Sequence, residues 1–133
     1  KSMSLATVDA FAIVLATVVS MIVGTIWYTA LARSWRRASR FDLLGDPERH
    51  GNVALAAAAQ GVMATVFSLL LAHFETVTLS DALFAALLLW LGFVATTLLV
   101  NRRFQGFGWD LPPIEAGHWL FVLLGQGLVF GSF

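Results

Sequence analysis

Long uncharged stretches alternate with short polar ones along the chain. The clearest is residues 82–100, an apolar run of 19 residues that ends abruptly in Asn101, Arg102 and Arg103. At about 1.5 Å per residue, a helix of this length crosses a bilayer core of roughly 30 Å. An uncharged run that stops at two arginines is typical of a membrane span whose arginine end faces the cytoplasm.

The same pattern recurs and predicts a single membrane domain over residues 1–133. Its fold class is all-α, an integral membrane four-helix bundle with spans at about 10–32, 51–74, 81–101 and 113–133. The link between the second and third spans is short, which predicts an antiparallel hairpin, and Ser80 is a candidate N-cap for the third helix. The sequence Asp46-Pro47-Glu48 predicts that the second helix starts near Pro47.

The basic residues predict the orientation. Seven of the eight lie in the segments 33–50 and 102–112, and the eighth is Lys1. The positive-inside rule therefore makes these two segments cytoplasmic loops and places both termini on the non-cytoplasmic side. Part of the first loop could form a short amphipathic interfacial helix, with a solvated loop as the alternative. The predicted membrane-interface anchors are Trp27, Trp35, Arg36, Arg37, Arg102, Arg103 and Trp109.

Composition narrows the chemistry. Hydrophobic residues make up 59% of the chain, charged residues only 12%, and the mean hydropathy is +0.82, as expected for a membrane protein. The absence of cysteine removes thiolate chemistry and disulfides, and no basic and aromatic stripe suggests nucleic acid. No hydrolase or phosphate-binding motif occurs, and helix capping and dipole effects explain Asp110 and Glu115. We expect no enzymatic activity and no bound metal or cofactor; a bound lipid is the one ligand that the sequence allows.

Polar side chains recur at one depth of the predicted spans. Counting from the cytoplasmic ends places them in the inner third of the bilayer. One interpretation is a polar pocket in which His118 accepts a proton or ligand; the alternative is hydrogen bonding between helices. Gln126 lies apart, toward the outer leaflet. This candidate polar layer or ligand pocket comprises Tyr28, Gln60, Thr96, Thr97 and His118.

Small residues repeat every four positions on the first and fourth spans, a spacing that lets helices approach closely. Such faces could close the bundle or join subunits. A monomer of this size has few helices to cover its polar groups, so we expect a homo-oligomer or a larger membrane complex. The predicted helix-packing or oligomer contacts are Ser20, Gly24, Gln126, Gly127 and Gly131.

Three segments carry a family resemblance: GTIWYTALARSWRR at 24–37, LLLWLGFVATTLLVNRRFQG at 87–106 and IEAGHWL at 114–120. Together they resemble the prokaryotic membrane family catalogued as domain of unknown function 1761. Members often have aspartate in place of Glu115, and tyrosine in place of Gly117 before the histidine. The resemblance implies a four-helix, multi-pass protein of a prokaryotic cytoplasmic (inner) membrane, and it implies no biochemistry.

Three functions follow as hypotheses. The leading one is a structural or accessory subunit that self-associates or joins a larger membrane complex. The second is a minimal transporter or channel subunit for a small solute or ion, with the inner polar layer lining the path. The third is a lipid- or quinone-binding protein, in which the arginine loop gathers anionic headgroups near Trp35.

Overall fold

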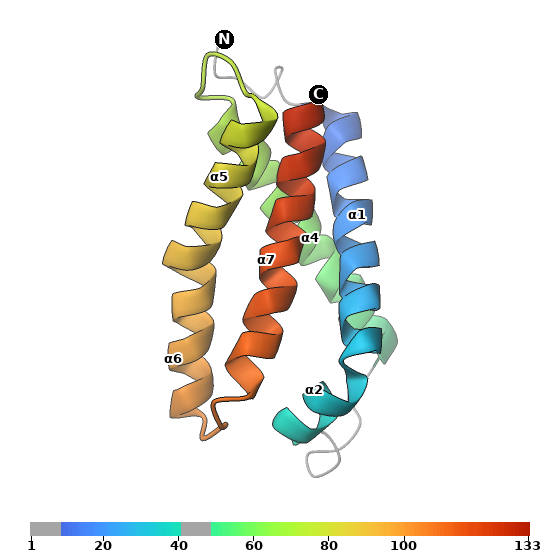
Figure 1. Ribbon diagram of the computed structural model, residues 1–133. Helices are drawn as coiled ribbons and strands as arrows, with labels where there is room; N and C mark the ends of the chain where they lie inside the picture. Colours follow the sequence, from blue (N-terminus) through green and yellow to red (C-terminus); the bar gives the residue numbers. More distant parts are fainter. Residues whose placement is uncertain (1–8, 41–48) are drawn as a thin grey trace.

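The computed structural model describes residues 9–40 and 49–133, and every element of regular secondary structure in these residues is a helix (Figure 1). The elements in chain order are α1 (Ala10–Ala30), α2 (Ala32–Ala38), α4 (Arg49–Leu71), α5 (Leu79–Leu89), the π-helical turn η2 (Trp90–Ala95), α6 (Thr96–Phe104) and α7 (Leu111–Ser132). Because α5, η2 and α6 follow one another without a break, they form one long rod.

Four helices are long and apolar enough to cross a membrane: Ala10–Ala30, Asn52–Leu71, Leu79–Phe104 and Leu111–Ser132. The predicted all-α class with four long apolar helices is confirmed. The predicted helix start at Asp46-Pro47-Glu48 lies outside the described residues. Within the segment predicted as the first loop, α2 forms a short helix, which corresponds to the first of the two alternatives for this segment.

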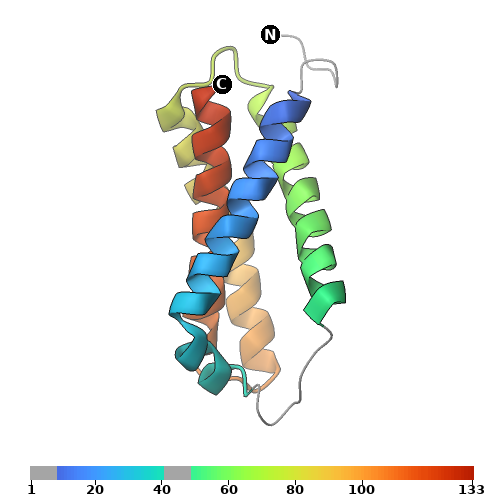
Figure 2. The same cartoon turned by 90° about the vertical axis from the view of Figure 1, so that its right-hand side faces the viewer.

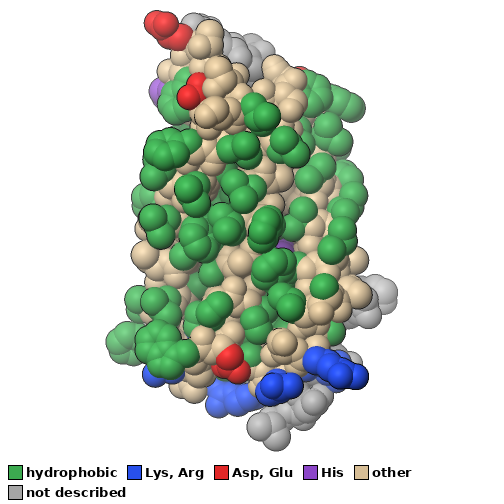
Figure 3. Space-filling view, viewed as in Figure 1, with side chains coloured by type: hydrophobic (Ala, Val, Ile, Leu, Met, Phe, Trp, Pro, Cys, Tyr) green, Lys and Arg blue, Asp and Glu red, His purple; other side chains and the backbone are tan. Residues whose placement is uncertain are grey.

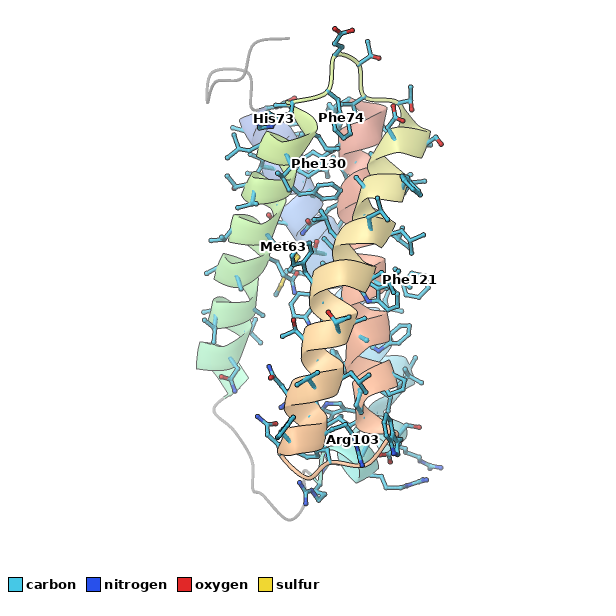
Figure 4. All side chains as sticks on the ribbon, turned by 90° about the vertical axis from the view of Figure 1, so that its left-hand side faces the viewer. Met63, His73, Phe74, Arg103, Phe121 and Phe130 are labelled. Atoms are coloured by element: carbon cyan, nitrogen blue, oxygen red, sulfur yellow. The ribbon has the colours of Figure 1, made fainter. Side chains whose placement is uncertain are left out.

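Helix α7 is the central element. It packs against α1 on one side and against α5 on the other, whereas α4 packs mainly on α1 (Figure 1). The share of buried residues is 39% in the α7 span and 17% or less in the other three. Helix α4 leans away from the other helices toward one end of the molecule (Figures 2 and 4). The bundle is therefore closed around α7 and open beside one half of α4.

Local capping explains where the helices begin. The Asp9 carboxylate accepts from the backbone N–H groups of Phe11 at 3.0 Å and Ala12 at 3.2 Å, which starts α1. Helix α5 starts with a capping box, in which Thr78 Oγ1 accepts from Asp81 N and the Asp81 carboxylate accepts from Thr78 N. The prediction that Ser80 caps this helix is wrong, because Thr78 is the N-cap, two residues earlier, and forms the reciprocal pair with Asp81.

Two small apolar cores join the helices. Phe67 and Leu71 of α4 pack with Ala82 and Ala86 of α5 and with Leu123 of α7. The second core is formed by Ala12, Ala16, Ala64 and Val129. Met63 and Phe130 flank the first core and point into the space between α4 and the neighbouring helices (Figure 4). Both cores draw on the second half of α4, so this half is tied into the bundle.

The surface separates by chemistry. Hydrophobic side chains cover the middle of the face shown in Figure 3, and arginines gather at one end. This end, called the basic end below, holds α2 and the last turn of α6 with Arg33, Arg36, Arg37, Arg40, Arg102 and Arg103. Such a band with a charged rim is the surface expected of a membrane-embedded bundle.

Gly127 is a site where α7 and α5 meet closely. A Cβ there would lie 3.0 Å from the carbonyl oxygen of Ala82, whereas a Cβ on Gly92 would meet nothing within 4 Å. We expect Gly127→Leu to lower the free energy of unfolding by about 1 to 3 kcal/mol, because the helices must separate to admit the side chain. Gly92→Leu is the matched control and should have little effect. Thermal unfolding in mild detergent, followed by circular dichroism, measures both; equal losses would contradict this packing.

Candidate functional site

The first turns of α7 are held from both sides by tryptophans. The indole Nε1 of Trp27 in α1 donates to the carbonyl oxygen of Ile114 at 2.9 Å. The indole Nε1 of Trp90, the first residue of η2, donates to the carbonyl oxygen of Ala116 at 2.7 Å. A carbonyl oxygen has two lone pairs, so it can accept an indole hydrogen bond in addition to a helical one. Two helices that flank α7 are thus tied to its backbone.

An ion pair joins the ends of α6 and α7. Arg102 contacts the Glu115 carboxylate twice, through Nε at 2.5 Å and through Nη2 at 2.8 Å. The side chains are 30% and 14% exposed, respectively. Arg102 Nη1 also donates to Gln105 Oε1 at 2.8 Å. Paired contacts of this geometry are among the stronger polar interactions in proteins.

This pairing corrects the interpretation of Glu115 as a residue explained by its helix start alone. The sequence signal was an arginine at the end of one helix and a glutamate in the first turns of the next. That signal does not say whether the two side chains face each other. The neighbouring Arg103 points elsewhere: its guanidinium lies 4.3 Å from the centre of the Trp109 ring and donates to the carbonyl oxygen of Phe107 at 2.7 Å.

At two adjacent places, a glycine of one of the helices α1 and α7 lies opposite an aromatic ring of the other. A Cβ on Gly24 of α1 would lie 2.9 Å from Nε2 of His118 in α7. Conversely, a Cβ on Gly117 of α7 would lie 2.6 Å from the ring of Trp27 in α1. Each helix therefore has a glycine opposite the large ring of the other. This reciprocal contact, called the glycine–ring pair below, lets both rings lie between the helices.

His118 is 5% exposed and lies among aromatic rings. Its ring centre is 4.9 Å from that of Tyr28 and 4.7 Å from that of Trp119. Tyr28 in turn contacts Trp35 of α2 edge to face. Among the described side chains, Nδ1 of His118 is one of four buried polar atoms without a hydrogen-bond partner. Of the predicted polar layer, His118 and Tyr28 are brought together.

A second polar cluster lies further along α7. Gln126 Nε2 donates to Ser20 Oγ at 3.0 Å and to the backbone carbonyl oxygen of Gln60 at 3.5 Å. All three residues are buried, and both glutamine Oε1 atoms have no partner in the described part of the chain. The expectation that Gln126 lies apart from Gln60 is wrong. Counting residues from each helix end does not show how the helices are offset along the bundle, and the hydrogen bond places Gln60 and Gln126 at the same level.

Thr96 and Thr97 are not part of either cluster. Both are exposed, and their hydroxyl groups donate to the backbone carbonyl oxygens of Gly92 at 3.0 Å and Phe93 at 2.5 Å. The predicted layer is therefore divided three ways, because the position along a helix sets the depth of a residue but not the face on which it lies. Gly127 and Gly131 face α5, where a Cβ would meet Ala82 and Leu79, respectively.

These features define an all-α protein with four helices of membrane-spanning length and a central helix held by polar contacts near the basic end. The chain belongs to the family described as "Protein of unknown function (DUF1761)", which matches residues 11–131. The resemblance seen in the sequence is thus confirmed over nearly the whole chain. No curated protein and no solved structure matches it.

The ion pair between Arg102 and Glu115 can be measured by a double-mutant cycle. We expect Arg102→Gln and Glu115→Gln to be non-additive by about 1 to 2 kcal/mol in the free energy of unfolding, because the pair is bidentate and partly shielded from water. Arg103→Gln combined with Glu115→Gln is the control and should be additive. An interaction energy of zero between Arg102 and Glu115 in this cycle would show that the pair contributes nothing to stability.

The glycine–ring pair predicts a conditional effect. Gly117→Ala should lower the free energy of unfolding by about 1 to 3 kcal/mol, because the Trp27 ring is held by its hydrogen bond and cannot move aside freely. In a Trp27→Ala background, the same substitution should have almost no further effect. Gly61→Ala is the control, since its Cβ would meet only Thr17 Oγ1 at 3.9 Å. A loss that is undiminished in the Trp27→Ala background would refute the contact.

Proposed function

We propose that this protein is a structural or accessory membrane subunit without enzymatic activity, which assembles with copies of itself or with a larger membrane complex. We place it in a prokaryotic cytoplasmic membrane with both termini on the non-cytoplasmic side. The charge distribution supports this orientation. The six arginines of α2, of the turn after it and of α6 lie at the basic end, whereas Asp9, Glu75 and Asp81 lie near the helix ends on the opposite side.

The observation that carries the proposal is the absence of buried residues in two described helix segments near the basic end. Residues 52–55 of α4 are all exposed, which means that a complete helical turn has no covered face. Residues 90–104, all of them described, contain no buried residue. The opposite half of α4 is tied into the bundle by Phe67 and Leu71. Helix halves left uncovered in this way can pair with helices of another subunit.

The polar side chains support a structural role for a separate reason. Trp27, Trp90 and the pair of Arg102 with Glu115 all connect helices to one another. Five threonine hydroxyl groups on the helices donate to their own backbone four residues earlier, so their hydrogens are already used within the helix. Groups of this kind stabilise helix packing in membranes.

One observation favours the second candidate, a minimal transporter or channel subunit for a small solute or ion. His118 Nδ1 and the Oε1 atoms of Gln60 and Gln126 are buried polar atoms without described partners. Burying a polar group in a membrane costs free energy unless the group forms a hydrogen bond or binds a ligand. The two candidates differ in one respect: His118→Ala would abolish transport while leaving assembly intact, whereas a scaffold would tolerate it.

Cross-linking tests the assembly role, and the absence of cysteine in the chain makes single-cysteine variants clean. Leu55 lies in the uncovered half of α4 and is 67% exposed; Phe84 on α5 is 61% exposed and is the matched control. In native membranes, a thiol-specific bifunctional reagent should link Leu55→Cys to a second copy or to another membrane protein. Phe84→Cys should give far less product. Equal yields at both positions, or a monomer only, would overturn the proposal.

A further inference from the structure

A continuous apolar groove runs between α1 and α4. Its first part has a volume of about 550 Å³ and is lined by side chains of α1 and α4, namely Ile13, Val14, Thr17, Val18, Ala58, Gly61, Val62, Thr65 and Val66. Its second part, of about 440 Å³, is lined by residues 17–26 of α1 and by Ala57. The two parts share Thr17 and Val18, so one groove extends along α1 toward the basic end. In Figure 2 it lies where α1 and α4 separate.

The three threonines in the groove do not make it polar. Thr17, Thr25 and Thr65 each donate their hydroxyl group to a backbone carbonyl oxygen in their own helix, at 2.8, 3.0 and 2.8 Å. Their hydrogen-bonding capacity as donors is therefore used within the helix. The rest of the lining is Val, Ile, Ala, Met and Gly. The occupant suited to such a surface is a hydrocarbon chain.

The length and the charge of the groove indicate which hydrocarbon. Its second part covers nine residue steps of α1, or about 14 Å, which is close to the 15 Å or so of one leaflet. Arg33 follows seven residues after Ile26, and Arg37 lies one turn beyond it on α2; both are exposed. Arginines at the membrane surface attract anionic headgroups. A chain in the groove would thus carry its headgroup to a cationic surface.

We propose that the groove between α1 and α4 is the binding site of an anionic phospholipid, with an acyl chain along 17–26 of α1 and the headgroup at the arginines of α2. A helix from a second copy would bring no anionic headgroup to these arginines. An anionic lipid instead neutralises that end, and it needs no partner from the proposed assembly.

The test uses the full chain, purified in mild detergent and exposed to mixed micelles with equal amounts of phosphatidylglycerol and phosphatidylcholine. Native mass spectrometry counts the lipids retained. We expect the wild-type chain to retain phosphatidylglycerol preferentially. Ala57→Phe fills the second part of the groove, where Ala57 is the lining residue of α4, and should lower this retention at least fivefold. Ala59→Phe is the matched control, because Ala59 is a nearby alanine that lines neither part of the groove, and it should retain lipid like the wild type.

Headgroup recognition is tested separately. Arg33→Gln and Arg37→Gln should each lower the preference for phosphatidylglycerol over phosphatidylcholine by about fivefold. Arg103→Gln removes an arginine at the same end that stacks on Trp109, and it should leave the preference unchanged. Circular dichroism on each variant confirms that it is folded.

Three results would overturn the site. One is that the wild type shows no preference for either lipid; another is that Ala57→Phe and Ala59→Phe behave alike. The third is that Arg103→Gln has the same effect as Arg33→Gln. Cross-linking of Val62→Cys to a second copy would instead assign the groove to another helix. None of these results depends on whether Leu55→Cys cross-links, so the assembly role and the lipid site can fail independently.

Discussion

The close contact between α1 and α7 depends on the reciprocal placement of glycines and rings. Two helices that each carried a large ring at this level could not approach, and two that carried only glycine would leave an empty space. With Gly24 opposite His118 and Gly117 opposite Trp27, both rings fit and each helix fills the gap in the other. The same approach brings the Trp27 indole to the backbone of α7, where it donates to Ile114. The close packing of α1 on α7 and the hydrogen bond from Trp27 therefore depend on the same arrangement of side chains.

The central position of α7 follows from this contact and from those on its other side. Trp90 reaches Ala116 from the rod formed by α5, η2 and α6, and Gly127 lets α5 approach further along. No comparable set of polar contacts holds the first half of α4 in the described structure, and this half leans away. The molecule therefore combines a rigid three-helix part with one helix attached mainly at its far end. Both proposals, assembly and lipid binding, depend on that asymmetry.

The fold could be predicted to a large extent from the chain, and the site only in part. Four uncharged runs of membrane-spanning length are sufficient to predict four long helices, since helix length follows directly from residue number. His118, Gly24 and Gln60 were recognisable as polar or small residues within apolar runs. Their partners were not, because partners depend on helix rotation and tilt. Glu115 had a sufficient local explanation at its helix start, and Gln126 was assigned to the wrong neighbourhood because residue counting does not show how the helices are offset along the bundle.

The π-helical turn η2 gives the rod a property that a continuous α-helix would lack. A π-helical turn accommodates an extra residue, so every side chain after it is rotated by about 100° relative to an uninterrupted α-helix. Arg102 lies seven residues beyond η2, and in this rotation it is the arginine that reaches Glu115, whereas Arg103 turns to Trp109. If η2 relaxed to α-helical geometry, Arg102 would swing away from Glu115 and the pair would break. The ion pair near the end of the rod therefore holds the rotation of a helix turn that lies in the middle of an apolar span.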